Sequence, residues 1–323
     1  MDQALIAETI RSVIASSAPL VFAGIGEMFT ERAGIVNLSL DGSILLAAMA
    51  GFAVALLTGS VTLGFALAMV VGALIALLVA FSSIVLYQDQ VAVGFVLTLL
   101  MADLSSFVGL PYVRKPGPSV PALAISGLSR IPYIGRVFFD QNLIVYASYL
   151  LIVLSWIWLM HTQAGLRLRS VGERPEAAYA RGINVNRLRF IYTAVGGALV
   201  GAAGAAYSLN VKLGWSHRHT AGMGWIALAI VIFGGWHPFR VALGAYLFGA
   251  LKSLGSLLQP NYPNIPTQVF QAAPFALMIL ALLLVSGDLS GVELYLPRRL
   301  RPLVHAVLQG TPPAALGRRF EQA

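Results

Sequence analysis

The feature that most constrains the fold is a succession of long apolar segments, most of them about 17 to 25 residues in length. A segment of this length crosses the hydrocarbon core of a bilayer as an α-helix, because a helix satisfies its own backbone hydrogen bonds. Nine segments fit or approach this description, at residues 5–27, 40–58, 61–83, 91–110, 141–160, 190–211, 222–236, 240–258 and 268–286. The sequence therefore predicts an all-α polytopic membrane protein, with about nine (eight to ten) transmembrane helices in a single bundle.

Composition argues against a soluble fold. Apolar residues make up 58% of the 323 positions and charged residues only 11%, which is too little polar surface for a water-soluble domain. The net charge of +8 would suit nucleic acid, yet the basic residues fall mostly in loops and in the tail. Such residues mark the cytoplasmic face of membrane proteins, so we expect no nucleic acid partner. The absence of cysteine excludes disulfides, thiolate metal sites and cysteine nucleophiles.

The segment at 222–236 is too short for a straight crossing. Irregular backbone survives at membrane depth only where protein or a water-filled cavity satisfies its polar groups. The sequence therefore predicts a broken or tilted element at this position.

Orientation follows from two polar loops, 111–140 and 161–189, which flank one predicted span and so lie on opposite sides. The second loop is richer in arginine for its length, which assigns it to the cytoplasm. Counting spans then places the N-terminus outside and the C-terminus inside. The chain divides into a transmembrane domain, 1–297, and a basic cytoplasmic tail, 298–323. The loop 111–140 is rich in proline and glycine, which predicts an ordered outer cap with little regular structure.

Small residues recur at helical spacing in "GGALVGAAGAAYS", residues 196–208. In lipid, small side chains let helix backbones approach closely, so Gly197, Gly201 and Gly204 predict tight helix packing. An additional role in helix sliding during transport stays open.

The most polar run in this apolar chain is "GERPEAAYARGINVNR", residues 172–187. Pro175 suits the first position of a helix, and Gly182 suits the left-handed position that ends one. Glu173 and Glu176 lie near the start of this helix, where negative charge is favourable. These residues predict a helix of about two turns at 175–181. It is either a solvated surface helix or a docking element whose arginines flank a small-residue face formed by Ala177, Ala178 and Ala180.

Three segments carry a family resemblance. The spacing from Glu176-Ala177-Ala178 to Gly182 resembles the EAA loop of ABC importer permeases, and "GLRLRSVGERPEAAYARGINVNRLR" (165–189) is similar to that loop in permeases for nucleosides, simple sugars and branched-chain amino acids. "GEMFTERAGIVNLSLDGSILLAA" (26–48) is similar to the first-span signature of the nucleoside and simple-sugar branch. "IALAIVIFGGWHPF" (226–239) is similar to its late Gly-Gly loop. The resemblance covers roughly residues 20–290.

The resemblance implies the type II architecture of vitamin B12 importer permeases, in a bacterial plasma (inner) membrane. It implies a nucleoside as the solute, with a simple sugar or another small polar solute as the alternative, moved by alternating access. The implied partners are two ATPase subunits, a second permease subunit and an extracellular or periplasmic solute-binding protein. For the second permease, the resemblance favours a paralogous chain over a second copy of this one. The implied ATPase-coupling residues are Glu173, Pro175, Glu176, Ala177, Ala178, Arg181 and Gly182.

The sequence indicates that this chain does not hydrolyse ATP, so the ATPase of an active transporter would be a separate chain. The phosphate-binding pattern G-x-x-x-x-G-K-S/T is absent, since none of the three lysines follows a glycine. Neither paired carboxylates nor a Ser-His-Asp set on a shared face is found, so we expect a transport subunit and not an enzyme. We expect no cofactor on this chain, with ATP and Mg²⁺ held by the ATPase subunits. A secondary carrier or facilitator that works without ATPases is the alternative of another class.

Polar residues in or beside the spans are candidates for the solute pathway, because an ionisable group at a helix centre costs about 2.5 to 3.5 kcal/mol unless it faces the bundle interior or water. Glu27, Glu31 and Arg32 more readily predict a structural junction at the inner end of the first span. Trp215 and Trp225 could stack on a solute, although interface anchoring is the more usual role of such tryptophans. Asn37 and Asp41 would share a helix face if the second span began early. The candidate pathway residues are Asn37, Asp41, Asp103, Asn210 and Trp215.

Overall fold

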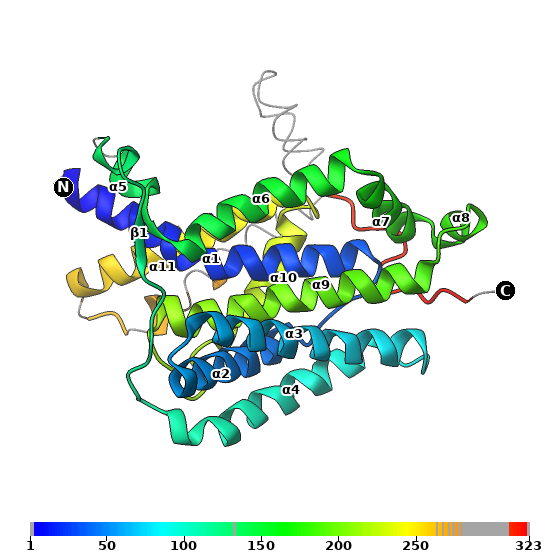
Figure 1. Ribbon diagram of the computed structural model, residues 1–323, viewed down its shortest axis with the longest axis horizontal. Coiled ribbons are helices and arrows are strands. Elements are labelled where there is room, and N and C mark those ends of the chain that lie inside the picture. Colours follow the sequence, from blue (N-terminus) through cyan, green and yellow to red (C-terminus); the bar gives the residue numbers. More distant parts are fainter. Residues whose placement is uncertain are drawn as a thin grey trace.

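The computed structural model describes residues 3–131, 134–262 and 310–321, together with 264–266, 268–270, 272, 275–276 and 279. The described residues form a bundle of helices that run along the long axis of the molecule (Figure 1). The longer helices are α1 Gln3–Arg32, α2 Leu40–Thr58, α3 Val61–Ile84, α4 Gln90–Gly109, α6 Leu143–His161, α7 Gln163–Glu173, α9 Val185–Ala206, α10 Met223–Phe233 and α11 Pro238–Leu258. The shorter elements are α5 Ile134–Phe138, α8 Pro175–Ala180, the π-helical turn Tyr207–Val211 and the 3-10 turns Leu110–Tyr112, Leu128–Arg130 and Gln259–Asn261.

Seven helices among the described residues are long and apolar enough to cross a membrane, namely α1, α2, α3, α4, α6, α9 and α11. The predicted all-α polytopic class is therefore confirmed, whereas the predicted count of about nine spans is not. The segment predicted at 222–236 contains α10, which has only 11 residues. Most of the segment predicted at 268–286 lies outside the described residues.

Side-chain caps explain where several of these helices begin. Asp89 accepts a hydrogen bond from the Ala92 amide (2.8 Å) at the start of α4, and Asn142 accepts one from the Val145 amide (3.1 Å) at the start of α6. Such caps satisfy amides that have no partner within the helix. The chain therefore breaks and restarts its helices at short polar residues between apolar runs.

Close backbone contacts hold the centre of the bundle together, where α9 packs against α1, α2 and α3. A Cβ atom added at Gly201 would overlap the Ala68 carbonyl oxygen of α3, and one at Gly197 would lie 2.5 Å from the Gly72 carbonyl oxygen. Gly204 faces α2 in the same way, since a Cβ atom added there would lie 2.7 Å from the Ile44 carbonyl oxygen. The tight packing predicted from these glycines is confirmed.

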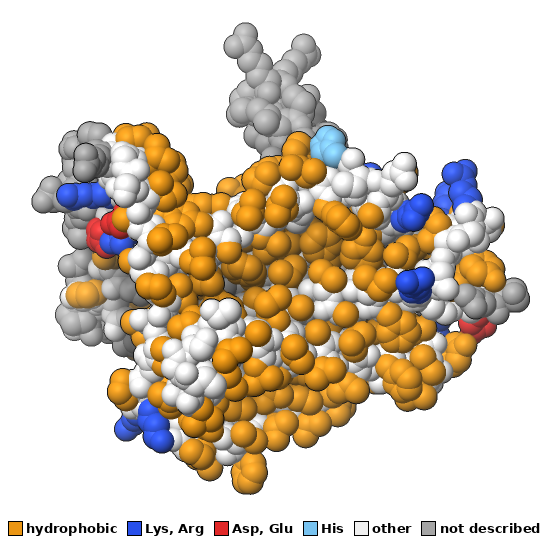
Figure 2. Space-filling model, in the orientation of Figure 1, with side chains coloured by type: hydrophobic (Ala, Val, Ile, Leu, Met, Phe, Trp, Pro, Cys, Tyr) orange, Lys and Arg blue, Asp and Glu red, His pale blue; other side chains and the backbone are white. Residues whose placement is uncertain are grey.

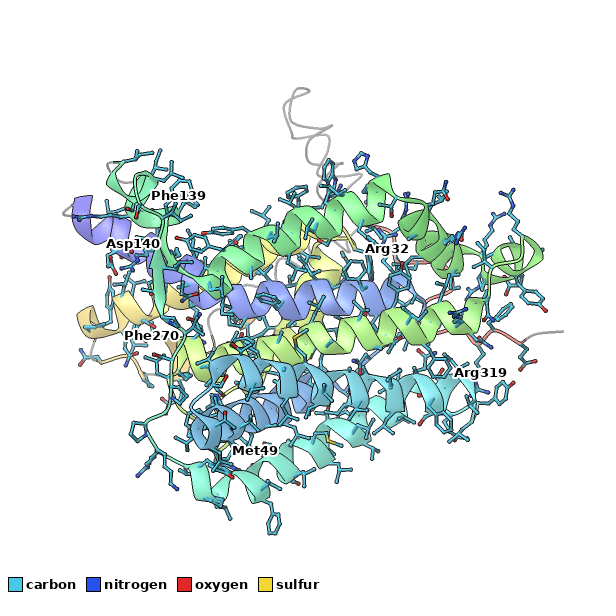
Figure 3. All side chains as sticks on the ribbon, in the orientation of Figure 1. Arg32, Met49, Phe139, Asp140, Phe270 and Arg319 are labelled. Atoms are coloured by element: carbon cyan, nitrogen blue, oxygen red, sulfur yellow. The ribbon has the colours of Figure 1, made fainter. Side chains whose placement is uncertain are left out.

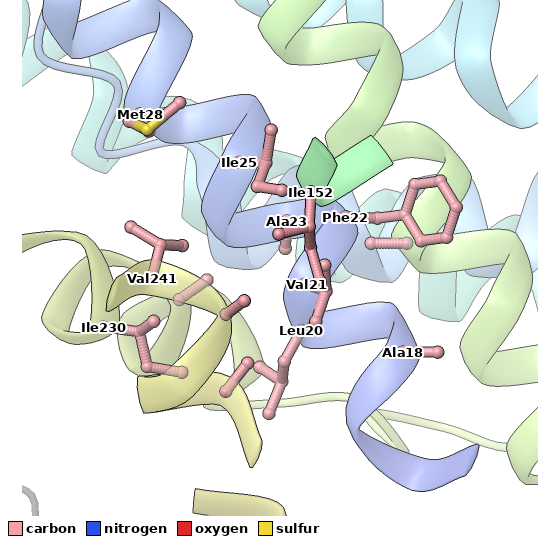
Figure 4. Close-up of a cluster of buried hydrophobic side chains, with 14 of the residues drawn as sticks. Ala18, Leu20, Val21, Phe22, Ala23, Ile25, Met28, Ile152, Ile230 and Val241 are labelled. Atoms are coloured by element: carbon pink, nitrogen blue, oxygen red, sulfur yellow. The ribbon is translucent and has the colours of Figure 1, made fainter. Parts of the chain in front are cut away.

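Apolar side chains fill the core and also cover the outside. A buried cluster joins α1 to α6, α10 and α11 through Ile25, Ile152, Ile230 and Val241 (Figure 4). The outer surfaces of α3, α4 and α6 are equally apolar, and Phe107 on α4 has 75% of its surface exposed. Figure 2 shows this apolar belt with basic side chains gathered near the two ends. A belt of this kind matches a lipid environment.

The two polar loops lie at opposite ends of the bundle (Figure 1). The loop 111–140 lies at the end that also holds the start of α1, which we call the distal end. There, strand β1 Ala122–Ala124 pairs antiparallel with β2 Asp140–Asn142, with Leu123 opposite Gln141. The loop 161–189 forms α7 and α8 at the other end, which we call the α8 end, and residues 310–321 lie beside it.

The chain is broken between α9 and α10, before the segment 222–236 for which the sequence predicts a broken or tilted element; within that segment α10 itself is a short, continuous helix. The turn Tyr207–Val211 is π-helical, and residues 212–222 are not helical. Ser208 in the π-helical turn donates to the Ala48 carbonyl of α2 (2.9 Å), and α10 then begins beside Asp41 at the start of α2. Polar groups of an interrupted helix are thus satisfied by a neighbouring helix.

Candidate functional site

The helix predicted at 175–181 is present as α8, and local chemistry explains its ends. It begins at Pro175, which has no amide hydrogen to leave unpaired in a first turn, and Glu176 adds a carboxylate there. The chain turns at Gly182, whose φ of +79° is a left-handed conformation that glycine adopts without strain. The Gly182 amide donates to the Tyr179 carbonyl (2.8 Å). The prediction is confirmed, with the helix ending one residue earlier, at Ala180.

One side of α8 is buried against the bundle and the other is exposed. Pro175 and Ala178 are buried, and only 2% of the surface of Ala178 is accessible. The exposed residues of the segment 173–182 are Glu173, Arg174, Glu176, Ala177, Tyr179, Ala180, Arg181 and Gly182. The predicted small-residue face of Ala177, Ala178 and Ala180 is therefore wrong as a single face, because a helix turns by about 100° per residue. The exposed side is bordered by Arg174 and Arg181.

Beside the end of α7, Arg32 at the end of α1 joins three segments that are far apart in the sequence. Its Nη2 and Nε atoms donate to the Trp236 carbonyl oxygen at 3.0 and 3.2 Å. Its Nη1 atom lies 3.8 Å from a carboxylate oxygen of Glu173 at the end of α7. Arg32 therefore links α7 with the loop before α11 (Figure 3).

Two buried glutamates of α1 complete this junction. The indole Nε1 of Trp236 donates to the carboxylate of Glu31, which has 3% of its surface exposed. One turn earlier, the carboxylate of Glu27 accepts a hydrogen bond from the Asn37 amide (3.2 Å). The structural junction predicted for Glu27, Glu31 and Arg32 is confirmed.

His237 follows Trp236 in the same loop. Burial lowers the pKa of His237, and the nearby guanidinium groups of Arg240 and Arg32 lower it further. The imidazole is therefore neutral at pH 7, since its ordinary pKa is already about 6.5. No group of three or more His, Asp or Glu side chains that could hold a metal ion occurs among the described residues.

Two of the predicted pathway residues, Asn37 and Asp41, accept hydrogen bonds from backbone amides of the protein. Asn37 lies before α2, where its side-chain oxygen accepts from the Ser39 amide (3.1 Å). Asp41, in the first turn of α2, accepts from the Gly224 amide (2.9 Å) at the start of α10. The prediction that Asn37 and Asp41 share a helix face required α2 to begin before Asn37. This prediction is wrong, because α2 begins only at Leu40. Asp41 instead places a carboxylate at the positive end of α10.

Asp103 and Asn210 lie towards the distal end. Asp103 is exposed on α4 and pairs with Arg218 at 3.2 Å. Asn210 accepts a hydrogen bond from the side chain of Asn142 and lines a cavity of about 360 Å³, together with Arg11 and Ser119. Asp103 and Asn210 thus have access to solvent or to a cavity, whereas Asn37 and Asp41 are buried.

Trp215, the fifth predicted pathway residue, is buried, with 3% of its surface exposed. A Cβ atom added at Gly109 would overlap its ring, which shows how closely the indole packs on the end of α4. Its backbone carbonyl accepts from the Arg114 amide (3.3 Å). The interface-anchoring role expected of Trp215 is wrong, because the indole fills the bundle instead of reaching its surface. Trp225, with 39% exposed, remains compatible with that role.

Sequence reasoning missed Arg189 and the segment 310–321. Arg189 has 1% of its surface exposed and donates to the Arg318 carbonyl (3.0 Å). A signal was present for Arg189, since it stands four residues after Val185 and four before Thr193, both on the buried face of α9. The docking of 310–321 has no comparable local signal.

Comparison with known proteins agrees with these features. Residues 9–282 match the family described as "Branched-chain amino acid transport system / permease component". No solved structure matches the chain.

Individual relatives are similar over most of their length. The chain is 36% identical to NupQ of Bacillus subtilis, named a guanosine ABC transporter permease, over 84% of this chain and 90% of NupQ. It is 34% identical to NupC of Lactococcus lactis, a nucleoside ABC transporter permease, over 87% of this chain and 94% of NupC. It is also 36% identical to TsgC13 of Haloferax volcanii, provisionally named for glucose, over 79% of this chain and 80% of TsgC13. NupP, a second guanosine permease of Bacillus subtilis, is 24% identical over 82% of the chain.

Proposed function

Because the chain belongs to this family of ABC transporter permeases, we propose that it forms the membrane pathway of an importer that takes up a nucleoside. The single observation that carries the coupling part of this proposal is α8, an exposed helix fixed on the bundle by its buried side. The nucleoside is supported by the similarity to NupQ and NupC. The chain is a transport subunit, and ATP hydrolysis is assigned to separate subunits.

In the proposed mechanism, the ATPase subunits bind the exposed side of α8 and move it as they close on ATP. The segment 173–182 passes this movement to Arg32 through Glu173 and then to the loop that contains Trp236. That loop connects α10 with α11, and the first turn of α10 is bonded to Asp41 of α2 through the Gly224 amide. The movement therefore reaches the interrupted element at the bundle centre, which opens the pathway alternately to the two sides.

We assign the solute pathway to the surroundings of the interrupted segment 212–222. Interrupted helices form solute sites in membrane transporters because their free backbone groups can bind ligands. Asp103 and Asn210 lie towards the distal entrance, Asp41 supports the start of α10, and Asn37 and Trp215 hold the surrounding turns. Few strong solute ligands are needed if a separate binding protein selects the solute.

The proposed assembly contains a paralogous second permease, two ATPase subunits and an extracellular or periplasmic binding protein, in a bacterial plasma membrane. A paralogous partner is supported by the similarity of this one chain to both NupQ and NupP. The α8 end faces the cytoplasm and the distal end, with the start of the chain, faces outward. We expect the variant Ser119→Cys to react with a thiol reagent that is added only on the outside. Labelling from the inside alone would contradict this orientation. The natural absence of cysteine makes the labelling specific.

The coupling role is tested by Gly182→Val, with Gly127→Val as the matched control. Both glycines have positive φ (+79° and +93°) and open space where a Cβ atom would lie, so valine introduces backbone strain at both turns. Only Gly182 adjoins α8. We expect Gly182→Val to lower guanosine uptake about tenfold and to reduce co-purification of the ATPase, and Gly127→Val to do neither. Normal uptake and assembly with Gly182→Val would overturn the coupling role.

A simple sugar is the second candidate solute, because the similarity to TsgC13 equals that to NupQ. Binding of guanosine and of glucose to the cognate solute-binding protein separates the two. A secondary carrier is the alternative mechanism. Uptake driven by a proton or sodium gradient in vesicles that contain this chain alone would establish that alternative and contradict the ATP-driven one.

A further inference from the structure

Residues 310–321, called here the C-terminal strap, are docked on the α8 end of the bundle by their backbone. The Ala315 amide donates to the Gly172 carbonyl (2.9 Å), and the Gly317 amide donates to the Gly34 carbonyl (3.1 Å). The carbonyl of Arg318 accepts from the buried guanidinium of Arg189 (3.0 Å). The strap is thus bonded to the end of α7, to the turn after α1 and to the first turns of α9.

The strap also packs against the buried side of α8. Phe320 has 7% of its surface exposed and packs in one apolar cluster with Val171, Ala178 and Val185. Its ring lies 5.6 Å, centroid to centroid, from the ring of Tyr179 on α8. A helix of six residues is too short to be stable alone, so its position depends on what it packs against.

At its other end the strap reaches the loop between α10 and α11. A Cβ atom added at Gly235 would lie 2.6 Å from the Cα atom of Gly310, which is backbone contact without room for a side chain. The Ala314 amide also donates to the carboxylate of Glu173 (3.3 Å), the same side chain that pairs with Arg32. The strap therefore contacts both ends of the proposed route from α8 to Trp236.

We propose that the C-terminal strap is a positioning element of ATPase coupling. It holds α8 at a fixed place on the ends of α1 and α9, and it carries the movement of α8 to the loop at Gly235. Phe320 is its principal contact, since it supports Ala178 and Tyr179 from below. This proposal depends on the coupling role of α8 proposed above.

The test compares three variants of the complete transporter in lipid vesicles, with guanosine and the cognate binding protein. Phe320→Ala removes the side chain that packs against α8, and Phe320→Leu keeps most of that side chain's volume. Arg319→Ala changes an exposed neighbour (Figure 3). We expect Phe320→Ala to keep basal ATP hydrolysis while guanosine uptake and its stimulation of hydrolysis fall about tenfold. Phe320→Leu recovers most of both, and Arg319→Ala changes neither. Normal uptake and stimulation with Phe320→Ala overturn the proposal.

A cross-linking experiment tests the contact between α8 and the strap by a second route. The pair Tyr179→Cys and Phe320→Cys is joined by a short bifunctional thiol reagent in a transporter whose other subunits lack cysteine. A positioning element stays docked, so we expect the cross-link to form both at rest and during turnover, and to restore the uptake that loss of the Phe320 ring lowers. Failure of the cross-link to form, or a cross-link that stops uptake, overturns the proposal.

The Gly182→Val variant, assayed in parallel, separates the two proposals. If Gly182→Val uncouples the transporter and Phe320→Ala does not, only the strap's role is wrong. If neither variant has an effect, the coupling role of α8 itself is wrong, and the strap's role with it.

Discussion

The two ends of the bundle hold their charged side chains in opposite ways. At the α8 end, Glu31 and Arg189 are buried, with 3% and 1% of their surfaces exposed, and they bond to Trp236 and to the Arg318 carbonyl. At the distal end, Arg218 pairs with Asp103 while 55% and 75% of their side chains are exposed. These buried charges at the α8 end therefore form a fixed network, whereas the pair Arg218–Asp103 at the distal end is one that water can separate.

This difference matches the work proposed for each end. A buried polar bond is costly to break, because a group left without its partner cannot turn to water. An exposed ion pair is worth about 0 to 1 kcal/mol, so it opens readily. The α8 end is suited to transmit force from an ATPase without losing its geometry, and the distal end is suited to admit a solute.

The largest effect is expected from Arg32→Ala at the α8 end. The change removes two hydrogen bonds to the Trp236 carbonyl and the ion pair with Glu173, and each bond to a charged group is worth about 1.5 to 3 kcal/mol. We expect a lower free energy of unfolding and a loss of guanosine uptake of more than about tenfold. Thermal unfolding in detergent and uptake in vesicles measure the two. A variant with normal uptake would show that α1 does not carry the coupling.

A smaller effect is expected from Trp236→Phe, which keeps a ring but removes the indole N–H. The buried carboxylate of Glu31 then loses its donor, at a cost of about 1 to 3 kcal/mol. Trp225→Phe is the matched control, because Trp225 is 39% exposed. The difference between the two melting temperatures measures the buried bond. Equal melting temperatures would contradict the description of the α8 end as a fixed network.

Much of this fold follows from local sequence. The apolar runs at 40–58, 61–83 and 240–258 match α2, α3 and α11 within two residues, because apolar segments of that length have no other stable form in lipid. The glycines at 197 and 201 predicted close packing, and Pro175 and Gly182 predicted α8, because these residues act on the backbone itself.

The rest depends on contacts between segments distant in sequence. Trp215 could anchor an interface or fill a core, and only the close approach of Gly109 decides for the core. Asp41 has the features of a solute ligand until Gly224, 183 residues later, is found to donate to it. The docking of Phe320 on α8 has no periodic pattern, since a short non-helical segment with a turn at 314–317 makes the contact. Local propensity specifies the helices, and tertiary packing assigns their polar residues.

The smallest effect on stability is expected at the distal end, from Arg218→Ala. Because both partners are exposed, loss of the pair with Asp103 changes the free energy of unfolding by at most about 1 kcal/mol, and less at high salt. A double-mutant cycle with Asp103→Asn measures the coupling between the two side chains. A coupling energy as large as the Trp236→Phe effect would show that the distal end is as fixed as the α8 end.

The same variants sharpen the role of Asp103. If its carboxylate serves only Arg218, then Asp103→Asn and Arg218→Ala change uptake equally little and the double variant adds nothing. If Asp103 contacts solute at the entrance, Asp103→Asn raises the solute concentration needed for half-maximal uptake while Arg218→Ala does not. The proposed pathway predicts the second result, since a charge that costs little to separate from its partner is free to meet a solute.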